Sequence, residues 1–379
     1  MNNMPQADEP DAGLRKPDGP LRRGWTTGAC ATAATKAALT ALLTGKFPDP
    51  VSITLPKGEQ PAFALATEKL ERNFAQAAII KDAGDDPDIT HGAMICVTVE
   101  PSEIGIVFAA GEGVGTITLE GLPLPVGQAA INPVPRQLMT NIVHEICAEQ
   151  SVAPNFKITV SIPGGEALAQ KTWNPRLGIK GGLSILGTTG IVHPFSCSSW
   201  IHSIHRGIDV ARAAGINHVL GSTGSTSEDA AIKVYGFEAI AQLDMGDFAG
   251  GLLKYLREHP IDKITIAGGF AKIVKLAQGA VDLHSGRSQV DMNFLAALTE
   301  KTDVKSPLNQ NLKDQILNAN TAAQALDLTR TNNIDLTAPI ADLARQTALN
   351  VLRGAPVDVE IMIVDRKGNV LHQTGFKGS

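Results

Sequence analysis

The segment NHVLGSTGSTSEDAAIKVY, residues 217–235, carries the clearest fold signal in the chain. A short apolar run at 217–221 is followed by glycine, serine and threonine, and then by helical spacing at 227–235. The same order returns in KITIAGGFAK, residues 263–272, where an apolar run precedes two glycines. Strands that alternate with helices in this way predict a parallel, Rossmann-like α/β sheet.

The alternation extends over the rest of the second half. Helical periodicity and buried-strand composition continue on both sides of the glycine-rich turns. We expect helices at residues 199–214, 248–258 and 271–278, a mostly helical stretch at 293–352, and a last strand at 358–365.

The first half has a different pattern. The run LRRGWTTGACATAATKAALTALL, residues 21–43, predicts a helix capped by Thr26 or Thr27 and ended by Gly45. Its small side chains would let another backbone or a flat ligand come close. Several β-branched runs and few helices follow, which predicts an α+β sheet domain. We expect strands at residues 51–55, 74–81, 93–100, 104–110 and 157–162, and a helix at 135–150.

These two patterns divide the chain. The sequence predicts a disordered tail at residues 1–20, an α+β domain at 21–195 and a Rossmann-like α/β domain at 196–379. The tail is polar and Pro-rich, with no apolar core of a signal peptide, and no apolar run is long enough to span a membrane. We therefore expect a cytoplasmic protein without a membrane partner.

Composition excludes further classes of function. Among 379 residues, 38 acidic and 33 basic side chains give a net charge of −5, and only 4% are aromatic. Such a chain neither attracts a polyanion over its whole surface nor offers a stacking platform, so no nucleic-acid partner is expected. Its four cysteines form no CxxC or CxxH pair, which disfavours a zinc site.

The two glycine-rich turns are candidate ligand-binding sites. Each follows an apolar strand, and open α/β sheets bind ligands at the carboxyl ends of their strands. Close backbone approach, hydroxyls and a helix N-terminus would suit a phosphate, a carboxylate or a ribose. The alternative is a plain strand-to-helix turn with a Ser or Thr cap. The candidate residues are Gly221, Ser222, Thr223, Gly224, Ser225, Gly268 and Gly269.

A third glycine cluster, GEGVG at residues 111–115, resembles a dinucleotide fingerprint only in its spacing. The strand-like run TITLE follows it, whereas a pyrophosphate loop leads into a helix. We expect a hairpin turn here, in which glycine supplies a positive φ.

The loop GDDPDITHG, residues 84–92, gathers acidic side chains and a histidine between two expected strands. Carboxylates near one another titrate together, so one of them could serve as a general base near neutral pH. Two alternatives remain open: a hard cation held by the carboxylates, and a solvated turn. The candidate catalytic residues are Asp85, Asp86, Asp88 and His91.

Several of these segments together resemble one family. The chain is similar, in order from about residue 21 to its C-terminus, to the cobalt-precorrin-5B C1-methyltransferases of anaerobic cobalamin biosynthesis. The resemblance is carried by LRRGWTTGACATAATKAA (21–38), GDDPDITHG (84–92), LPVGQAAINPVPR (124–136), GGLSILGTTGIVHPFS (181–196), VLGSTGSTSE (219–228) and AGGFAKIVKLAQGAVDLHSGRSQVD (267–291).

The resemblance implies methyl transfer from S-adenosylmethionine to C1 of cobalt-precorrin-5B, giving cobalt-precorrin-6A. The cobalt belongs to the substrate, so no protein-bound metal is implied. The product would be handed to other enzymes of the cobalamin pathway. A non-enzymatic tetrapyrrole carrier or chelatase-like protein is the alternative. In either case the bound macrocycle carries carboxylates, which need local cations and a helix N-terminus. The candidate substrate-binding residues are Arg22, Arg23, Thr26, Thr27, Arg136 and Lys272.

Overall fold

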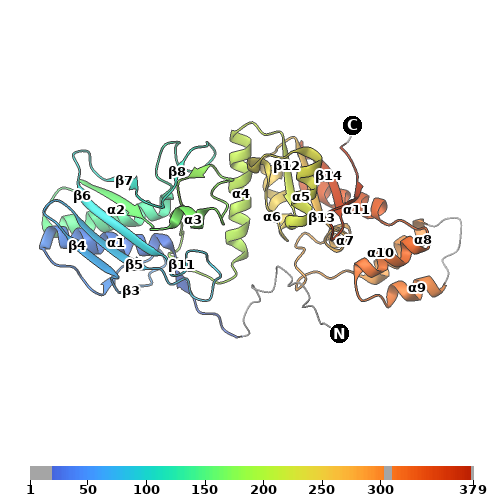
Figure 1. The fold of residues 1–379 in the computed structure, drawn as a ribbon, viewed down its shortest axis with the longest axis horizontal. Coiled ribbons are helices and arrows are strands. Elements are labelled where there is room, and N and C mark those ends of the chain that lie inside the picture. The colour runs from blue at the N-terminus through green and yellow to red at the C-terminus, as the bar shows by residue number, and fades with distance from the viewer. Residues whose placement is uncertain (1–18, 303–309, 377–379) are drawn as a thin grey trace, which may run out of the picture. The chain divides into compact units, whose positions relative to one another are not determined.

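The computed structural model describes residues 19–302 and 310–376. Nearly all of the tail expected at residues 1–20 lies outside these ranges. The chain divides into two compact units, residues 1–197 and 198–379, and each contains its own sheet and helices (Figure 1). Among the described residues, no helix is both long and apolar enough to cross a membrane.

The first unit is built on a five-stranded sheet. Its strands lie in the order β4-β5-β6-β9-β7, and all neighbours are antiparallel except β9 and β7. The α+β pattern expected for this half is therefore present. The strands are β4 (Thr67–Leu70), β5 (Ala75–Ile80), β6 (Met94–Pro101), β9 (Phe156–Ser161) and β7 (Val107–Ala110).

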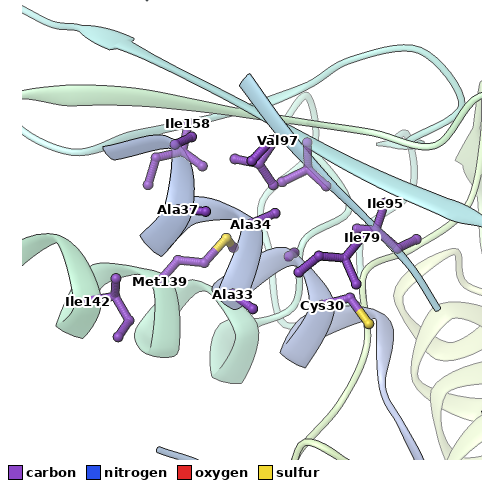
Figure 2. Close-up of a cluster of buried hydrophobic side chains, with 14 of the residues drawn as sticks. Cys30, Ala33, Ala34, Ala37, Ile79, Ile95, Val97, Met139, Ile142 and Ile158 are labelled. Atoms are coloured by element: carbon purple, nitrogen blue, oxygen red, sulfur yellow. The ribbon is translucent and has the colours of Figure 1, made fainter. Parts of the chain in front are cut away.

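Helix α1 (Thr27–Thr44) lies between this sheet and helix α2 (Pro133–Gln150). Figure 2 shows Ala33, Ala34 and Ala37 of α1 among side chains from the strands and from α2. The helix is buried on nearly every side, which its alanines make feasible because small side chains let both neighbours approach. Thr26 caps it by accepting a hydrogen bond from the Ala29 amide at 3.2 Å, and Gly45 ends it at φ 79°.

Short strand pairs complete the first unit. Strand β1 (Gly24–Trp25) pairs with β11 (Ile191–Val192), and β2 (Val51–Ser52) pairs with β3 (Ala62–Phe63), so regular pairing in the run expected at 51–55 is limited to its start. The remaining short elements are β8 (Thr116–Ile117), β10 (Ile179–Lys180) and helix α3 (Gly165–Ala169).

The hairpin expected at GEGVG is wrong. Strand β7 before it pairs with β9, whereas β8 after it pairs with β10. The glycines instead let backbones cross: a Cβ at Gly113 would lie 1.9 Å from the carbonyl oxygen of Ile162, and one at Gly182 would lie 2.2 Å from Gly113. Gly113 also has a positive φ of 70°. The segment is thus a close backbone crossing rather than a turn between paired strands.

The second unit contains a four-stranded sheet in the order β12-β13-β14-β15. The first three strands are parallel, as the alternation of strands and helices predicts, and the last is antiparallel. Helix α5 (Ser225–Tyr235) packs against the three parallel strands, and α11 (Thr337–Leu352) packs on β14, α6 (Ala249–Glu258) and α7 (Phe270–Ala277). The strands are β12 (His218–Ser222), β13 (Lys263–Gly269), β14 (Asp358–Val364) and β15 (Val370–Gln373).

Helices make up most of the rest of the second unit. Helices α8, α9 and α10 contact one another and lie in the stretch that the sequence predicts to be mostly helical. The helices are α4 (Cys197–Ala213), α5 (Ser225–Tyr235), α6 (Ala249–Glu258), α7 (Phe270–Ala277), α8 (Met292–Thr302), α9 (Gln310–Leu317), α10 (Ala322–Thr331) and α11 (Thr337–Leu352).

Candidate functional site

The two glycine-rich turns of the second unit lie side by side. Ser222 at the end of β12 is the register partner of Ala267 in β13, and the Thr223 amide donates to the Ala267 carbonyl at 2.9 Å. A Cβ on Gly268 would lie 3.0 Å from the Thr223 side chain. The parallel register therefore brings both candidate ligand-binding turns to the carboxyl edge of the sheet.

Gly224 leaves open space at this edge. An added Cβ there would meet no atom within 4 Å, and its φ of 168° is an extended conformation that any residue adopts. Helix α5 begins at the next residue, and its N-cap makes no side-chain hydrogen bond. Instead the Ser227 hydroxyl donates to the Gly224 carbonyl at 2.8 Å. The start of α5 thus lacks the Ser or Thr cap of a plain turn.

A neighbouring segment that the sequence analysis did not single out flanks the same edge. The amides of Leu243 and Gly246 donate to the carbonyls of Leu220 and Ser222 at 2.8 and 2.9 Å. Asp247 follows and forms an ion pair with Lys272. No motif in LDMGD, residues 243–247, signals this placement, because backbone pairing carries no side-chain pattern.

The ammonium of Lys272 is therefore bonded to other residues of the second unit. Besides Asp247, its ammonium donates to the Leu283 carbonyl at 3.2 Å, and the buried Lys275 donates to the same carbonyl at 2.9 Å. These bonds hold the start of the segment after α7 against the carboxyl edge of the sheet.

In the first unit, the acidic loop joins β5 to β6 and contains two inward-facing carboxylates. Asp88 accepts from the Lys81 ammonium at 2.5 Å and from the Thr90 hydroxyl and amide at 2.6 and 2.7 Å. Asp86 accepts from the amide of Phe195 at 2.8 Å. Phe195 has a φ of 56°, which is unusual for a residue with a bulky side chain.

The other two loop candidates are more exposed. Asp85 accepts from the Arg22 amide at 2.6 Å, and the Nδ1 atom of His91 accepts from the Ala83 amide at 3.1 Å. His91 therefore carries its proton on Nε2 when neutral, and that nitrogen faces away from this bond.

The carboxyl groups of Asp86 and Asp88 have pKa values shifted in opposite directions by their surroundings. Burial raises the pKa of Asp86, and the nearby Asp88 carboxylate acts in the same direction. Burial acts on Asp88 too, but the Lys81 ammonium outweighs it and leaves the pKa of Asp88 below its ordinary value. Asp86 is thus the better proton acceptor of the two, and Asp88 is the structural anion.

Lys81 and Asp82 were missed by the sequence analysis, although both lie beside the loop. Asp82 accepts two bonds from the Arg22 guanidinium, one of them at 2.9 Å, and these bonds lower its pKa to about 2. Lys81 ends a strand, where a lysine is ordinarily a solvated charge, so its position gave no signal.

The candidate cations of the first unit differ in whether other groups of the chain bind them. Arg22 is engaged by Asp82, whereas Arg23 is exposed and has no polar partner among the described residues. Arg136 donates to the carbonyls of Ile131 and Ala129 and to the Gln128 side chain, and burial lowers its pKa. Arg136 therefore holds residues 128–131, the segment before α2, against the start of that helix.

Thr26 and Thr27 belong to the start of α1. Thr26 is its N-cap and packs against Gly187, where a Cβ would lie 2.2 Å from the Thr26 hydroxyl oxygen. Thr27 is buried. In the described part of the chain, no group of three His, Cys, Asp or Glu side chains is placed to hold a metal ion.

Comparisons with known proteins assign the chain to a family. The family described as CbiD matches residues 14–194, and the one described as CbiD, C-terminal domain, matches residues 282–375. Curated proteins of Brucella anthropi, Brucella canis and Brucella suis, each named cobalt-precorrin-5B C(1)-methyltransferase, are 67% identical over 93% of this chain and 95% of their own lengths. The chain belongs to this CbiD methyltransferase family.

A solved structure also matches. It is a crystal structure of cobalamin biosynthesis protein (cbiD) from Archaeoglobus fulgidus, at 27% sequence identity and a TM-score of 0.39. The match covers 71% of this chain and 84% of that one.

Proposed function

We propose that this chain transfers the methyl group of S-adenosylmethionine to C1 of cobalt-precorrin-5B, giving cobalt-precorrin-6A in cobalamin biosynthesis. The observation that supports the proposal is membership in a family whose curated members are named cobalt-precorrin-5B C(1)-methyltransferase, at 67% identity over nearly the whole chain. The non-enzymatic carrier alternative has no comparable support.

The donor is proposed to bind in the second unit, a Rossmann-like domain at residues 196–379. Open space at Gly224 and the adjoining turns at Ser222 and Gly268 suit close approach by an adenosine or a carboxylate. The donor supplies an electrophilic methyl group. The chain residues bind and orient it, and positioning of this kind can lower a barrier by about 7–11 kcal/mol.

The corrinoid is proposed to bind in the α+β domain, residues 21–195. Arg23 is an exposed cation close in sequence to the capped start of α1, and the acidic loop lies beside it through the bond from Arg22 to Asp85. Asp86, whose pKa is raised, is the proposed proton acceptor when the methylated ring loses a proton. We also propose a cytoplasmic location and hand-over of product to later enzymes of the pathway.

A single-turnover assay tests the reaction. Purified chain would be mixed anaerobically with cobalt-precorrin-5B and methyl-labelled S-adenosylmethionine, and the corrinoid would be analysed by mass spectrometry and NMR. We expect one labelled methyl group at C1 and equimolar S-adenosylhomocysteine. Corrinoid binding without label transfer, under conditions in which a curated relative reacts, would contradict the proposal.

A further inference from the structure

An exposed apolar surface lies beside the acidic loop in the first unit. It surrounds an open cavity of about 330 Å³ whose lining includes Trp25, Phe63, Ile79 and Asp82. The Trp25 and Phe63 rings meet edge-on with their centres 5.8 Å apart. The exposed members of the lining are Ala62, Ala64, Ala66 and Ile80, and we call this surface the alanine shelf.

The exposed side chains of the shelf are unusual for a protein surface. In the run AFALA, residues 62–66, Phe63 is buried and Leu65 is half-buried, while the alternating alanines are exposed. Only Ala62 and Phe63 belong to a strand, β3, and exposed segments ordinarily carry polar side chains. Ile80 at the end of β5 also lines the cavity and is 50% exposed, so the exposed part of the lining is apolar.

The one charged residue in the lining of the cavity is paired. Asp82 lines the cavity, but its carboxylate accepts two bonds from Arg22. Arg23 is exposed, has no polar partner among the described residues and precedes Trp25 by two residues. The uncommitted charge near Trp25 is therefore positive.

We propose that the alanine shelf binds the corrin ring of the substrate, with Arg23 meeting one of its carboxylates. The inference rests on the function proposed above and assigns its substrate site. A corrin ring is flat and apolar on its faces and carries acidic side chains at its edge, which matches an apolar shelf with a cation beside it. The positively charged sulfonium of the methyl donor fits less well, because Asp82 is already paired. The lining of the cavity ends at Asp82, two residues before the acidic loop begins.

A matched pair of substitutions tests the shelf. Ile80→Glu places a charge on it, while Ile104→Glu makes the same change at an 82% exposed residue in the loop after β6, at the opposite end of the strand from the acidic loop. Cobyrinic acid, which carries free carboxylates, and cobinamide, whose carboxylates are amidated, would be titrated calorimetrically into the full chain. S-adenosylhomocysteine would be titrated in parallel.

We expect Ile80→Glu to raise the Kd of both corrinoids at least tenfold and Ile104→Glu to leave both unchanged. Arg23→Gln should raise the Kd for cobyrinic acid several-fold and leave the Kd for cobinamide unchanged. The affinity for S-adenosylhomocysteine should not change. Equal corrinoid affinity in Ile80→Glu and Ile104→Glu would overturn the shelf and leave the proposed reaction standing. Loss of S-adenosylhomocysteine binding alone would make the shelf a donor site instead. A wild-type chain that binds neither corrinoid would overturn the shelf, whereas the proposed reaction is decided by the single-turnover assay with cobalt-precorrin-5B.

Discussion

The ammonium of Lys81 lies 2.5 Å from a carboxylate oxygen of Asp88, and only 3% of the lysine side chain is exposed. The same ammonium donates to the Thr90 hydroxyl at 2.5 Å. A buried lysine at the end of β5 thus holds the acidic loop in place from inside. This bond makes Asp88 an anchor with a lowered pKa, whereas burial raises the pKa of its neighbour Asp86.

Removing the charge of Asp88 should destabilise the first unit. Asp88→Asn keeps an oxygen that can accept from Thr90 but leaves the Lys81 charge buried and unpaired. Breaking a buried ion pair in this way costs about 3–5 kcal/mol, and we expect about 3 kcal/mol because Asp88 is 22% exposed. Urea unfolding followed by circular dichroism measures the change.

Glu100→Gln is the matched control for that experiment. It removes the exposed pair between Glu100 and Lys157, whose side chains are 37% and 44% exposed. Exposed pairs contribute less than about 1 kcal/mol. Similar losses for both substitutions would show that the Lys81 pair is no more than a surface contact.

Asp82 should add an acid-sensitive component to stability. Bonds from Arg22 lower its pKa from 3.8 to about 2 in the folded chain. The unfolded chain therefore binds the proton more readily, so this stabilisation is complete above about pH 4 and is lost as the pH falls toward 2. The unfolding free energy of Asp82→Asn should fall less steeply than that of the wild type across this interval. Parallel curves in urea titrations at each pH would contradict the prediction.

Gly224→Val should separate folding from donor binding. The extended backbone and the empty space around Gly224 accommodate a side chain, so the melting temperature should stay close to that of the wild type. The branched side chain would occupy the space proposed for the donor, and we expect the Kd for S-adenosylhomocysteine to rise at least tenfold. Calorimetry showing unchanged affinity in a folded variant would remove this turn from the donor site.

Sequence patterns located the turns of the second unit better than the contacts of the first. The positions of Ser222 and Gly268 follow from strand periodicity, because parallel neighbours end at one edge of a sheet. The partner of Asp86 is a backbone amide 109 residues away, at Phe195. A backbone donor leaves no trace in residue type, so this contact could not be predicted.

The same limit explains the fate of the candidate cations. Arg22, Arg136 and Lys272 are all basic residues next to glycine-rich segments, yet each is engaged by its own unit. Only the packed structure distinguishes them from Arg23, since the acidic partners of Arg22 and Lys272 lie 60 and 25 residues away and Arg136 donates mainly to backbone carbonyls. In the same way GEGVG resembled a turn because spacing does not reveal which backbones cross.

The last prediction concerns the reaction itself. Asp86→Asn retains an oxygen that can accept from the Phe195 amide, so the loop should keep its shape while its proton acceptor is lost. Loss of a general base costs about 10²- to 10⁴-fold in rate, and we expect kcat to fall at least tenfold while the corrinoid still binds. We expect a similar fall in His91→Ala, which removes the imidazole that we propose as a proton relay in the same loop as Asp86. In the wild type the rate should rise with pH through the raised pKa of Asp86, and this rise should disappear in Asp86→Asn.

Glu100→Gln, at the far end of β6, controls for general effects of charge. Single-turnover rates measured anaerobically across pH, with and without EDTA, decide the question: unchanged rates in both loop variants would assign the loop a structural role, and activity lost to EDTA but restored by Mg²⁺ would favour a bound cation.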